Sequence, residues 1–394
     1  MLPRLRAPHS GDLVLGALFQ SAIAVAAATR FDAATFDPVV LDGIRAGTYP
    51  GAALAIGTAD SILYIKGYGH LTWSASSPVV DPERTLYDLA SVTKVVATTA
   101  ALMVLIDRGR VRLDAPVATY VPEFNGPGTN AITVRQLLTH TSGLRADLTL
   151  DTIRGAPDAA ALLRVVYAET PRIGVGSRVV YSDVNAVLLG EVVRRASGAP
   201  LDSFVAHEIF APLGMTETGF HPARSVLSRT APTGVWRGHP IAGVVNDPTA
   251  AKLGGMSGNA GVFSTARDVA RFAQFILRRG LSASGARIVR AATVDTFITR
   301  SAWFGGKSEA RALGWQAVPT GEEVSSAGTR FGVHSFGHTG WTGTSLWIDP
   351  DRGVFVVLLT NRAFQPRTRK PFTMLKRVRG RLADLAAEAG DARR

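Results

Sequence analysis

A serine and a lysine stand three residues apart at the start of a long apolar segment, residues 88–110. The segment reads DLASVTKVVATTAALMVLIDRGR, so Ser91 and Lys94 precede a run of Val, Ala, Leu, Met and Ile. Side chains three apart share one face of a helix. Near a helix N-terminus the backbone N–H groups favour negative charge, which would stabilise an alkoxide on Ser91. The pattern therefore predicts an activated serine nucleophile.

Lys94 is the expected base for this nucleophile. It lies one turn deeper, beside Val95 and Val96, where its ammonium would be desolvated. Desolvation lowers the pKa of a lysine and makes the neutral amine available. The alternative is an N-cap serine beside a lysine that extends to solvent, because S-x-x-K alone occurs often by chance.

Two further motifs follow in order along the chain. VVYSDVN (179–185) places Tyr181 just before a predicted helix, where its phenol could pass a proton to a leaving group. FGHTGWTGT (336–344) places an H-T-G triplet, beginning at His338, at the end of a predicted strand. Taken singly, Tyr181 reads as a packed aromatic residue and the triplet as a turn. The three motifs together, in this order, favour a catalytic site.

Strand-like segments stand near both ends of the chain, and helix-like segments lie between them. GAALAIGTADSILYIKGYG (51–69) reads as two strands joined by a tight turn, and GVFVVLLTN (353–361) as another strand. This order predicts a sheet domain made of residues 30–100 and 255–390, with a mainly helical domain, 101–254, inserted between them. A cleft between two such parts is the expected ligand site.

The motifs resemble those of the serine penicillin-recognising hydrolases, namely class C β-lactamases, D-alanyl-D-alanine carboxypeptidases of the penicillin-binding type, and related esterases. The marks of this family are S-x-x-K, Y-x-N and K/H-T-G. SVTK matches the first, YSD the second in part, and HTG the third. LLTHTSGL (137–144), GGMSGNAGVFSTARDVARF (254–272) and WIDPDRGVFVVLLTNR (347–362) extend the resemblance over roughly residues 35–365. It implies an α/β (α+β) fold of the β-lactamase/transpeptidase type, with an antiparallel sheet flanked by helices.

The resemblance also implies a role for each motif residue. Ser91 would be the acylated nucleophile, and Lys94 and Tyr181 would share the general base and acid work. The backbone N–H groups of Ser91 and Trp341 would form the oxyanion hole. No metal or cofactor is expected. The expected substrate-binding residues are Asp183, His338, Thr339 and Gly340.

Two departures from the family pattern bear on the substrate. Asp183 stands where the family more often has asparagine, and a carboxylate cannot donate to an acylamino carbonyl. Near Lys94 it would also favour the ammonium form and leave more of the base work to Tyr181. His338 replaces the lysine of most β-lactamases, so a permanent charge for a substrate carboxylate becomes a titratable one. Both departures favour an esterase or a D-Ala-type peptidase, with a β-lactamase proper as the alternative.

Two other kinds of function stay open. A non-catalytic module that binds penicillin or peptidoglycan would keep the pocket without turnover, and Asp183 is the one feature in its favour. An adhesion or scaffold role could use the basic segment RTRKPFTMLKRVRGRL (367–382), which otherwise reads as a solvated helix face. The expected partner of the leading hypothesis is a small-molecule ester, a D-amino-acid peptide or a β-lactam.

Composition bounds the class of protein. The 394 residues are 46% hydrophobic, carry a net charge of +12 and include no cysteine, which excludes disulfides and cysteine nucleophiles. No zinc-finger or RNA-recognition signature accompanies the charge, so nucleic acid is not an expected partner. Residues 1–28 combine MLPRLR with an apolar run, the order of a secretory signal. We therefore expect a periplasmic or secreted protein with no membrane span after processing, or a cytoplasmic one if this segment is a first helix.

Overall fold

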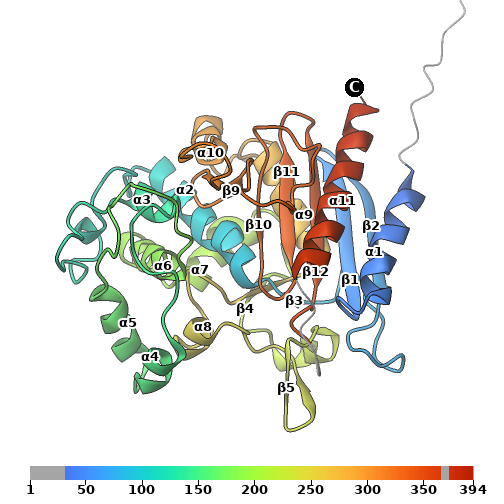
Figure 1. The fold of residues 1–394 in the computed structure, drawn as a ribbon, viewed down its shortest axis with the longest axis horizontal. Coiled ribbons are helices and arrows are strands. Elements are labelled where there is room, and N and C mark those ends of the chain that lie inside the picture. The colour runs from blue at the N-terminus through green and yellow to red at the C-terminus, as the bar shows by residue number, and fades with distance from the viewer. Residues whose placement is uncertain (1–31, 365–371, 394) are drawn as a thin grey trace, which may run out of the picture.

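The computed structural model describes residues 32–364 and 372–393. An antiparallel sheet lies beside a mainly helical region (Figure 1). The sheet has seven strands. The predicted secretory signal, residues 1–28, lies outside the described residues, so the location of the protein in the cell stays a prediction.

The strand order of the large sheet is β2-β1-β12-β11-β10-β9-β8. Within the sheet, β1 pairs with β12, from Ala52 opposite Thr360 to Thr58 opposite Val354. A strand from the N-terminal part of the chain thus lies next to a strand from the C-terminal part. The strands from both chain ends that the sequence predicted are therefore confirmed. Their bounds are β1 Gly51–Thr58, β2 Ile62–Gly69, β8 Ala310–Arg311, β9 Gln316–Ala317, β10 Phe336–Thr339, β11 Ser345–Asp349 and β12 Val354–Thr360.

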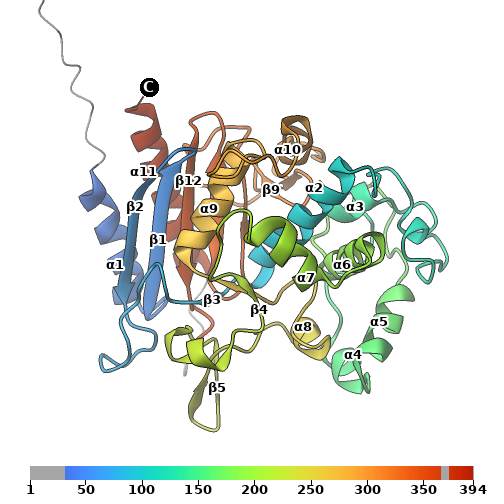
Figure 2. The ribbon, with the colours of Figure 1, turned by 180° about the vertical axis from the view of Figure 1, so that it is seen from behind.

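Helices cover both faces of the sheet. Helix α9 (Ala266–Leu277) covers one face (Figure 2), while α1 (Phe36–Arg45) and α11 (Phe372–Asp391) cover the other. Leu54 packs in the cluster that includes α1 and α11, whereas Ala53 packs in the cluster that includes α9. Because both faces are covered, β1 and β12 read as continuous apolar runs rather than as alternating ones.

Local caps mark the ends of several helices in the helical region. Thr133 begins α3 with a capping box, Ser182 caps α6, and Gly198 ends α6 with a φ of 76°. The division of the chain into two domains stays a prediction. The remaining α-helices are α3 Val134–Leu138, α4 Leu150–Gly155, α5 Ala159–Tyr167, α6 Asp183–Ser197, α7 Leu201–Val205, α8 Pro248–Lys252 and α10 Ala291–Ile298. The short strands are β3 Tyr87–Asp88, β4 Gly219–Phe220, β5 Gly234–Trp236, β6 His239–Ile241 and β7 Val262–Ser264.

One helical segment, Ala90–Asp107, runs through the interior and begins at the candidate nucleophile. It is not the regular helix that the sequence predicted. A 3₁₀ turn (Ala90–Val92) leads into a π-helical stretch (Lys94–Thr99) and then into α2 (Ala100–Asp107). By length and composition the segment could cross a membrane, but 83% of it is buried, as in the core helix of a soluble domain. π-Helical turns often occur at functional sites.

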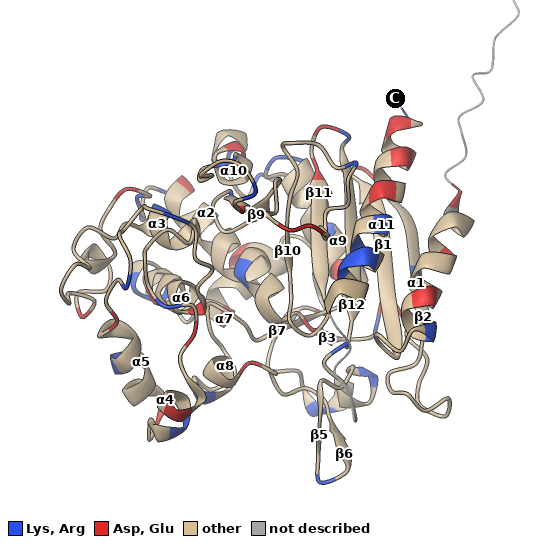
Figure 3. Ribbon diagram, viewed as in Figure 1, with Lys and Arg blue, Asp and Glu red and all other residues tan. Residues whose placement is uncertain are grey.

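The charges of α11 are unevenly distributed along its length. Figure 3 shows basic residues in the first half of the helix and acidic residues toward its C-terminal end. Residues 367–371 of the predicted basic segment lie outside the described residues. Within the described part, Arg377 and Arg381 are exposed, as expected for a solvated helix face, whereas Arg379 is buried.

Candidate active site

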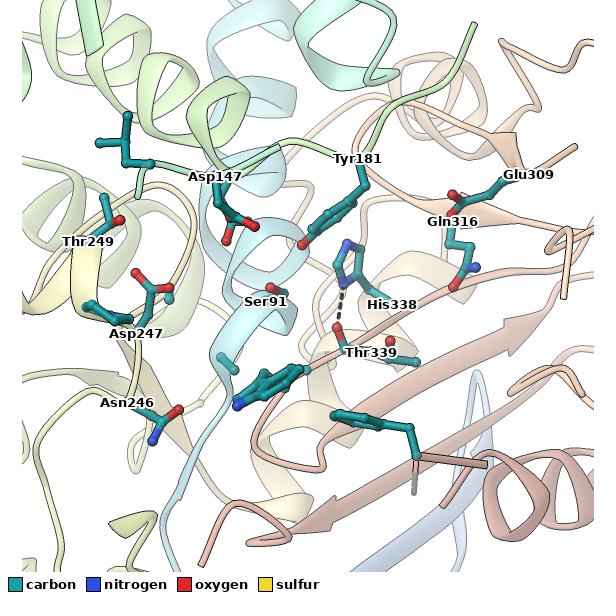
Figure 4. A pocket seen from close by; sticks show the side chains of 18 of the residues that line it. Ser91, Asp147, Tyr181, Asn246, Asp247, Thr249, Glu309, Gln316, His338 and Thr339 are labelled. Atoms are coloured by element: carbon teal, nitrogen blue, oxygen red, sulfur yellow. Dashed lines mark hydrogen bonds between the residues drawn. The ribbon is translucent and has the colours of Figure 1, made fainter. Parts of the chain in front are cut away.

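A pocket of about 580 Å³ opens between the sheet and the helical region, and Figure 4 shows many of its side chains. Its walls come from distant parts of the chain. They include part of residues 88–94, called the nucleophile segment below, together with the loop before α6, the strand β10 and the helix α11. The polar residues among those that line it are Ser91, Asp147, Tyr181, Asp183, Asn246, Asp247, Thr249, Glu309, Arg311, Gln316, Glu322, His338, Thr339, Lys376 and Arg379.

Ser91 and Lys94 are in direct contact at the floor of this pocket. The Lys94 ammonium donates to Ser91 Oγ at 2.9 Å and to the carbonyl of Asn259 at 3.0 Å. Its Nζ also lies 2.5 Å from Asp183 Oδ1. The Lys94 side chain is 4% exposed, so these contacts replace most of its hydration.

The pKa of Lys94 differs from the sequence-based prediction. Burial lowers it, as expected, but the charge of Asp183 and the interaction with Tyr181 more than offset burial. The net result is a pKa above the usual value for lysine. The predicted neutral amine is therefore wrong for the resting site, where Asp183 holds Lys94 as an ammonium.

Tyr181 directs its hydroxyl end toward Ser91 (Figure 4). The centre of its ring lies 5.1 Å from Lys94 Nζ. The same ring packs between His140, at 4.7 Å between centroids, and His338, at 5.9 Å. Burial raises the pKa of Tyr181 above its usual value, although Lys94 opposes this, so the phenol is protonated at neutral pH.

His140 supports the loop that carries Tyr181. Its Nδ1 accepts the backbone N–H of Ser182 at 3.1 Å, which requires the unprotonated nitrogen. Burial, then the charges of Arg311 and Lys94, keep the pKa of His140 well below its usual value. His140 is thus a buried, neutral histidine that holds this loop in place.

His338 is a neutral side chain in this site. Its Nδ1–H donates to the carbonyl of Thr339 at 3.0 Å. Burial lowers the pKa of His338 well below its usual value, and Lys94 and Arg311 lower it further. The predicted titratable charge for a substrate carboxylate is therefore wrong. Arg311 is a permanent charge close by, and its guanidinium carbon lies 5.2 Å from the centre of the Tyr181 ring.

The residue before the nucleophile has an uncommon backbone conformation. Ala90 has a φ of 46°, in the left-handed region that is costly for a residue with a side chain. Asp88 Oδ1 accepts the N–H of Ala90 at 2.8 Å, and Oδ2 accepts the N–H of Asn246 at 2.7 Å. Burial raises the pKa of Asp88 to about 6, although both N–H groups oppose this. The carboxylate thus fixes the turn that presents Ser91.

Trp341 lies in a tight turn between β10 and β11. The N–H of Gly340 donates to the carbonyl of Thr344 at 2.8 Å, and the N–H of Gly343 to the carbonyl of Gly340 at 3.1 Å. A Cβ at Gly340 would lie 2.4 Å from the carbonyl oxygen of Leu89, so only glycine fits there. The backbone of H-T-G therefore approaches the nucleophile segment closely.

Two threonine hydroxyls fasten this turn to the nucleophile segment. Thr342 Oγ1 donates to the carbonyl of Asp88 at 2.7 Å, and Thr344 Oγ1 to the carbonyl of Leu89 at 2.8 Å. Both bonds are buried. The two expected oxyanion-hole residues, Ser91 and Trp341, thus belong to segments that are tied together.

Three carboxylates line the helical side of the pocket, and the sequence motifs revealed only Asp183. Burial and the charge of Asp183 raise the pKa of Asp147 to about 6, and the same two causes raise the pKa of Asp247. Asp147 lies in a loop, and Asp247 reads simply as the N-cap of the short helix α8. Among the described residues no group of three or more His, Cys, Asp or Glu side chains is arranged to hold a metal ion.

The antiparallel sheet, the helical region beside it and the Ser91–Lys94 contact between them define a serine hydrolase of the β-lactamase/penicillin-binding protein fold. The sequence matches the Beta-lactamase family over residues 36–378, and the chain belongs to this family. The sequence-based resemblance to penicillin-recognising hydrolases is thereby confirmed.

Proteins similar to this chain in sequence or in structure carry several names. The chain is 33% identical over 351 residues to a protein of Escherichia coli (strain K12) that carries D-alanyl-D-alanine carboxypeptidase as a provisional name, and the match covers 81% of this chain and 80% of that protein. A penicillin-binding protein homologue from Caulobacter crescentus has a similar structure, with a TM-score of 0.69 and 22% identity over 90% of this chain and 98% of the other. EstCE1, described as a hydrolase with promiscuous acyltransferase activity, gives a TM-score of 0.69 and 21% identity, covering 91% and 99% of the two chains.

Proposed function

We propose that this serine hydrolase cleaves carboxylic esters or D-Ala-type peptides through an acyl-enzyme on Ser91. The observation that carries the proposal is the 2.9 Å contact between Ser91 Oγ and Lys94 Nζ, in a pocket open to ligands. A hydroxyl beside a base and a second proton carrier is the arrangement that makes serine nucleophilic.

The proposed reaction has two halves. In molecules where Lys94 or Tyr181 has lost its own proton, Ser91 passes its proton to that group while Oγ attacks the substrate carbonyl carbon. The proton then passes to the leaving alkoxide or amine as its bond to carbon breaks, which leaves the acyl group on Ser91. A water molecule repeats the sequence on the acyl-enzyme, releasing the carboxylic acid and restoring the serine.

The negative charge that forms on the carbonyl oxygen is assigned to the backbone N–H groups of Ser91 and Trp341. Donors of this kind typically lower the barrier by about 3–4 kcal/mol each. Thr339 and Gly340 would bind the substrate along β10. Asp183 would act chiefly by setting the charge of Lys94, because the two are ion-paired at 2.5 Å.

The substrate class rests on Asp183 and His338. Asp183 cannot donate to an acylamino carbonyl, as the asparagine found more often in the family can. His338 is uncharged, so it does not provide the positive charge that the lysine of most β-lactamases provides. The E. coli relative that carries D-alanyl-D-alanine carboxypeptidase as a provisional name supports the peptidase half of the proposal.

A kinetic panel tests the proposal with short-chain p-nitrophenyl esters, a D-Ala-D-Ala peptide and nitrocefin. The wild type should turn over the esters or the peptide faster than nitrocefin. Ser91→Ala should lower kcat by at least about 10³-fold, and Tyr181→Phe by about 10²–10⁴-fold. Turnover of nitrocefin alone would instead indicate a β-lactamase. Binding of a peptidoglycan fragment without any turnover would indicate the non-catalytic module.

A further inference from the structure

A buried arginine of the C-terminal helix reaches the turn that carries Trp341. Arg379 of α11 is 3% exposed, and its Nη2 donates to the carbonyl of Thr344 at 2.7 Å and to that of Gly340 at 3.4 Å. The interpretation of residues 367–382 as a solvated helix face is therefore wrong at this position. Arg379 also lines the pocket that contains Ser91.

The carbonyl of Gly340 and the N–H of Trp341 belong to one peptide unit. In a planar trans peptide these two groups point in opposite directions. A guanidinium at the carbonyl therefore lies behind the N–H group assigned to the oxyanion hole. A cation in this place fixes the orientation of the peptide and polarises it, which strengthens the N–H as a donor.

The hydrogen bonds of Arg379 suggest more than a packing role. Burying a charge is unfavourable unless the charge is compensated, and apolar residues of similar volume often fill such places at lower cost. Arg379 directs Nη2 at two backbone carbonyls of the turn, while its Nε is buried without a hydrogen-bond partner among the described residues. The neighbouring Lys376, by contrast, is paired with Glu322 at 2.7 Å.

The turn is thus held on two sides. Thr342 and Thr344 fasten it to the segment before Ser91, and Arg379 fastens it to the C-terminal helix. We propose that Arg379 is a positioning residue, which holds and polarises the Gly340–Trp341 peptide so that its N–H faces the developing oxyanion. This inference rests on the proposed function, because it assigns Arg379 a part in the same reaction.

The test compares Arg379→Gln and Arg379→Lys with Arg377→Gln, a matched change at an exposed arginine of the same helix. Each protein is titrated with a fluorophosphonate to count reactive sites, and kcat and KM for a p-nitrophenyl ester are expressed per titrated site. Inhibition by phenylboronic acid is measured in parallel, because its tetrahedral adduct with serine imitates the transition state and places an oxygen in the oxyanion hole.

Arg379→Gln should lower kcat per titrated site by about 10–100-fold with KM within about twofold, and should weaken phenylboronic acid by the same factor. Arg379→Lys should recover part of both losses, and Arg377→Gln should match the wild type. Loss of folded protein alone would reduce the number of titrated sites without changing these constants. An unchanged kcat per site, or a lower kcat with unchanged boronate inhibition, would overturn the inference. If the wild type itself is neither labelled at Ser91 nor active, the proposed function fails instead.

Discussion

Lys94 is shared between two partners at the floor of the pocket, donating to Ser91 and pairing with Asp183. Because Asp183 raises the pKa of Lys94 and burial raises that of Tyr181, neither group is a free base at neutral pH. Reaction requires the small fraction of molecules in which one of them has lost its proton. Activity should therefore rise with pH into the alkaline range.

Replacing Asp183 tests this dependence on charge. Asp183→Asn removes the negative charge that raises the pKa values of Lys94 and Tyr181, so either base loses its proton at lower pH. The acid limb of kcat/KM against pH should move down by about 1–3 units. Asp147→Asn is the control, since it removes the same charge from the same wall but not from the ion pair. If the acid limb of Asp183→Asn stays in place or moves to higher pH, Asp183 does not raise the pKa of the catalytic base.

At this scale the motifs predicted the residues in contact but not their charges. Ser91 with Lys94, and Tyr181 on its own, could be found because each belongs to a short motif with a fixed local pattern. Arg311 and Asp147 could not, because each approaches the pocket through tertiary structure, with no local pattern to mark it. The protonation of Lys94 depends on a residue 89 positions away in sequence, and the sequence analysis could state it only as a condition.

At the scale of elements, the site depends on the close approach of α6 to the loop before β7. Gly258 packs against α6, where a Cβ would lie 2.0 Å from the carbonyl oxygen of Ala186. The carbonyl of Gly258 accepts from Thr98 Oγ1 at 2.8 Å, and that of the next residue, Asn259, accepts from Lys94. The glycine therefore allows the backbone to reach the catalytic lysine.

Gly258→Ala should push α6 and this loop apart. The expected loss of unfolding free energy is about 1–3 kcal/mol, typical of overpacking a close contact, together with a clear fall in kcat. Gly155→Ala, where a Cβ would meet nothing within 4 Å, should change stability by less than about 0.5 kcal/mol. Urea denaturation followed by circular dichroism measures both. Equal stabilities for the two variants would contradict the close contact.

The sequence predicted most elements of this site but not the shape of its central helix. Thr133 and Gly198 mark helix ends through a local hydrogen bond and a left-handed residue, so they could be read directly. The change from a 3₁₀ turn to a π-helical stretch between Ala90 and Thr99 has no such local signal. Its polar contacts, from Lys94 to Asn259 and Asp183, are long-range.

At the scale of the whole molecule, the sheet and its core need segments from both the N-terminal and the C-terminal part of the chain. The C-terminal helix α11 buries Leu375 and Leu382 in the cluster that also contains Phe36 and Leu54 from the N-terminal part. The fold class could be predicted from the sequence, because strands at both ends require partners from each other. The strand order and the contact of Arg379 with the catalytic turn could not, since they depend on how α11 seats on the sheet.

Leu382→Ala tests the coupling between this core and the site. The side chain is fully buried, so truncation should cost about 2–5 kcal/mol, whereas Met374→Ala, at a partly exposed position of the same helix, should cost much less. In urea, circular dichroism and fluorophosphonate labelling of Ser91 should give the same lowered midpoint, because the site lies between the two parts of the fold. Labelling that persists beyond the loss of secondary structure would contradict this.

The most direct measurement is the intact mass of the folded protein after treatment with a fluorophosphonate, followed by peptide mapping. The wild type should gain the mass of one phosphonyl group, located on Ser91. Ser91→Ala and the urea-unfolded wild type should gain none, because labelling needs the nucleophile and the assembled contact with Lys94. A label on another residue, or equal labelling of wild type and Ser91→Ala, would contradict the assignment of Ser91 as the nucleophile.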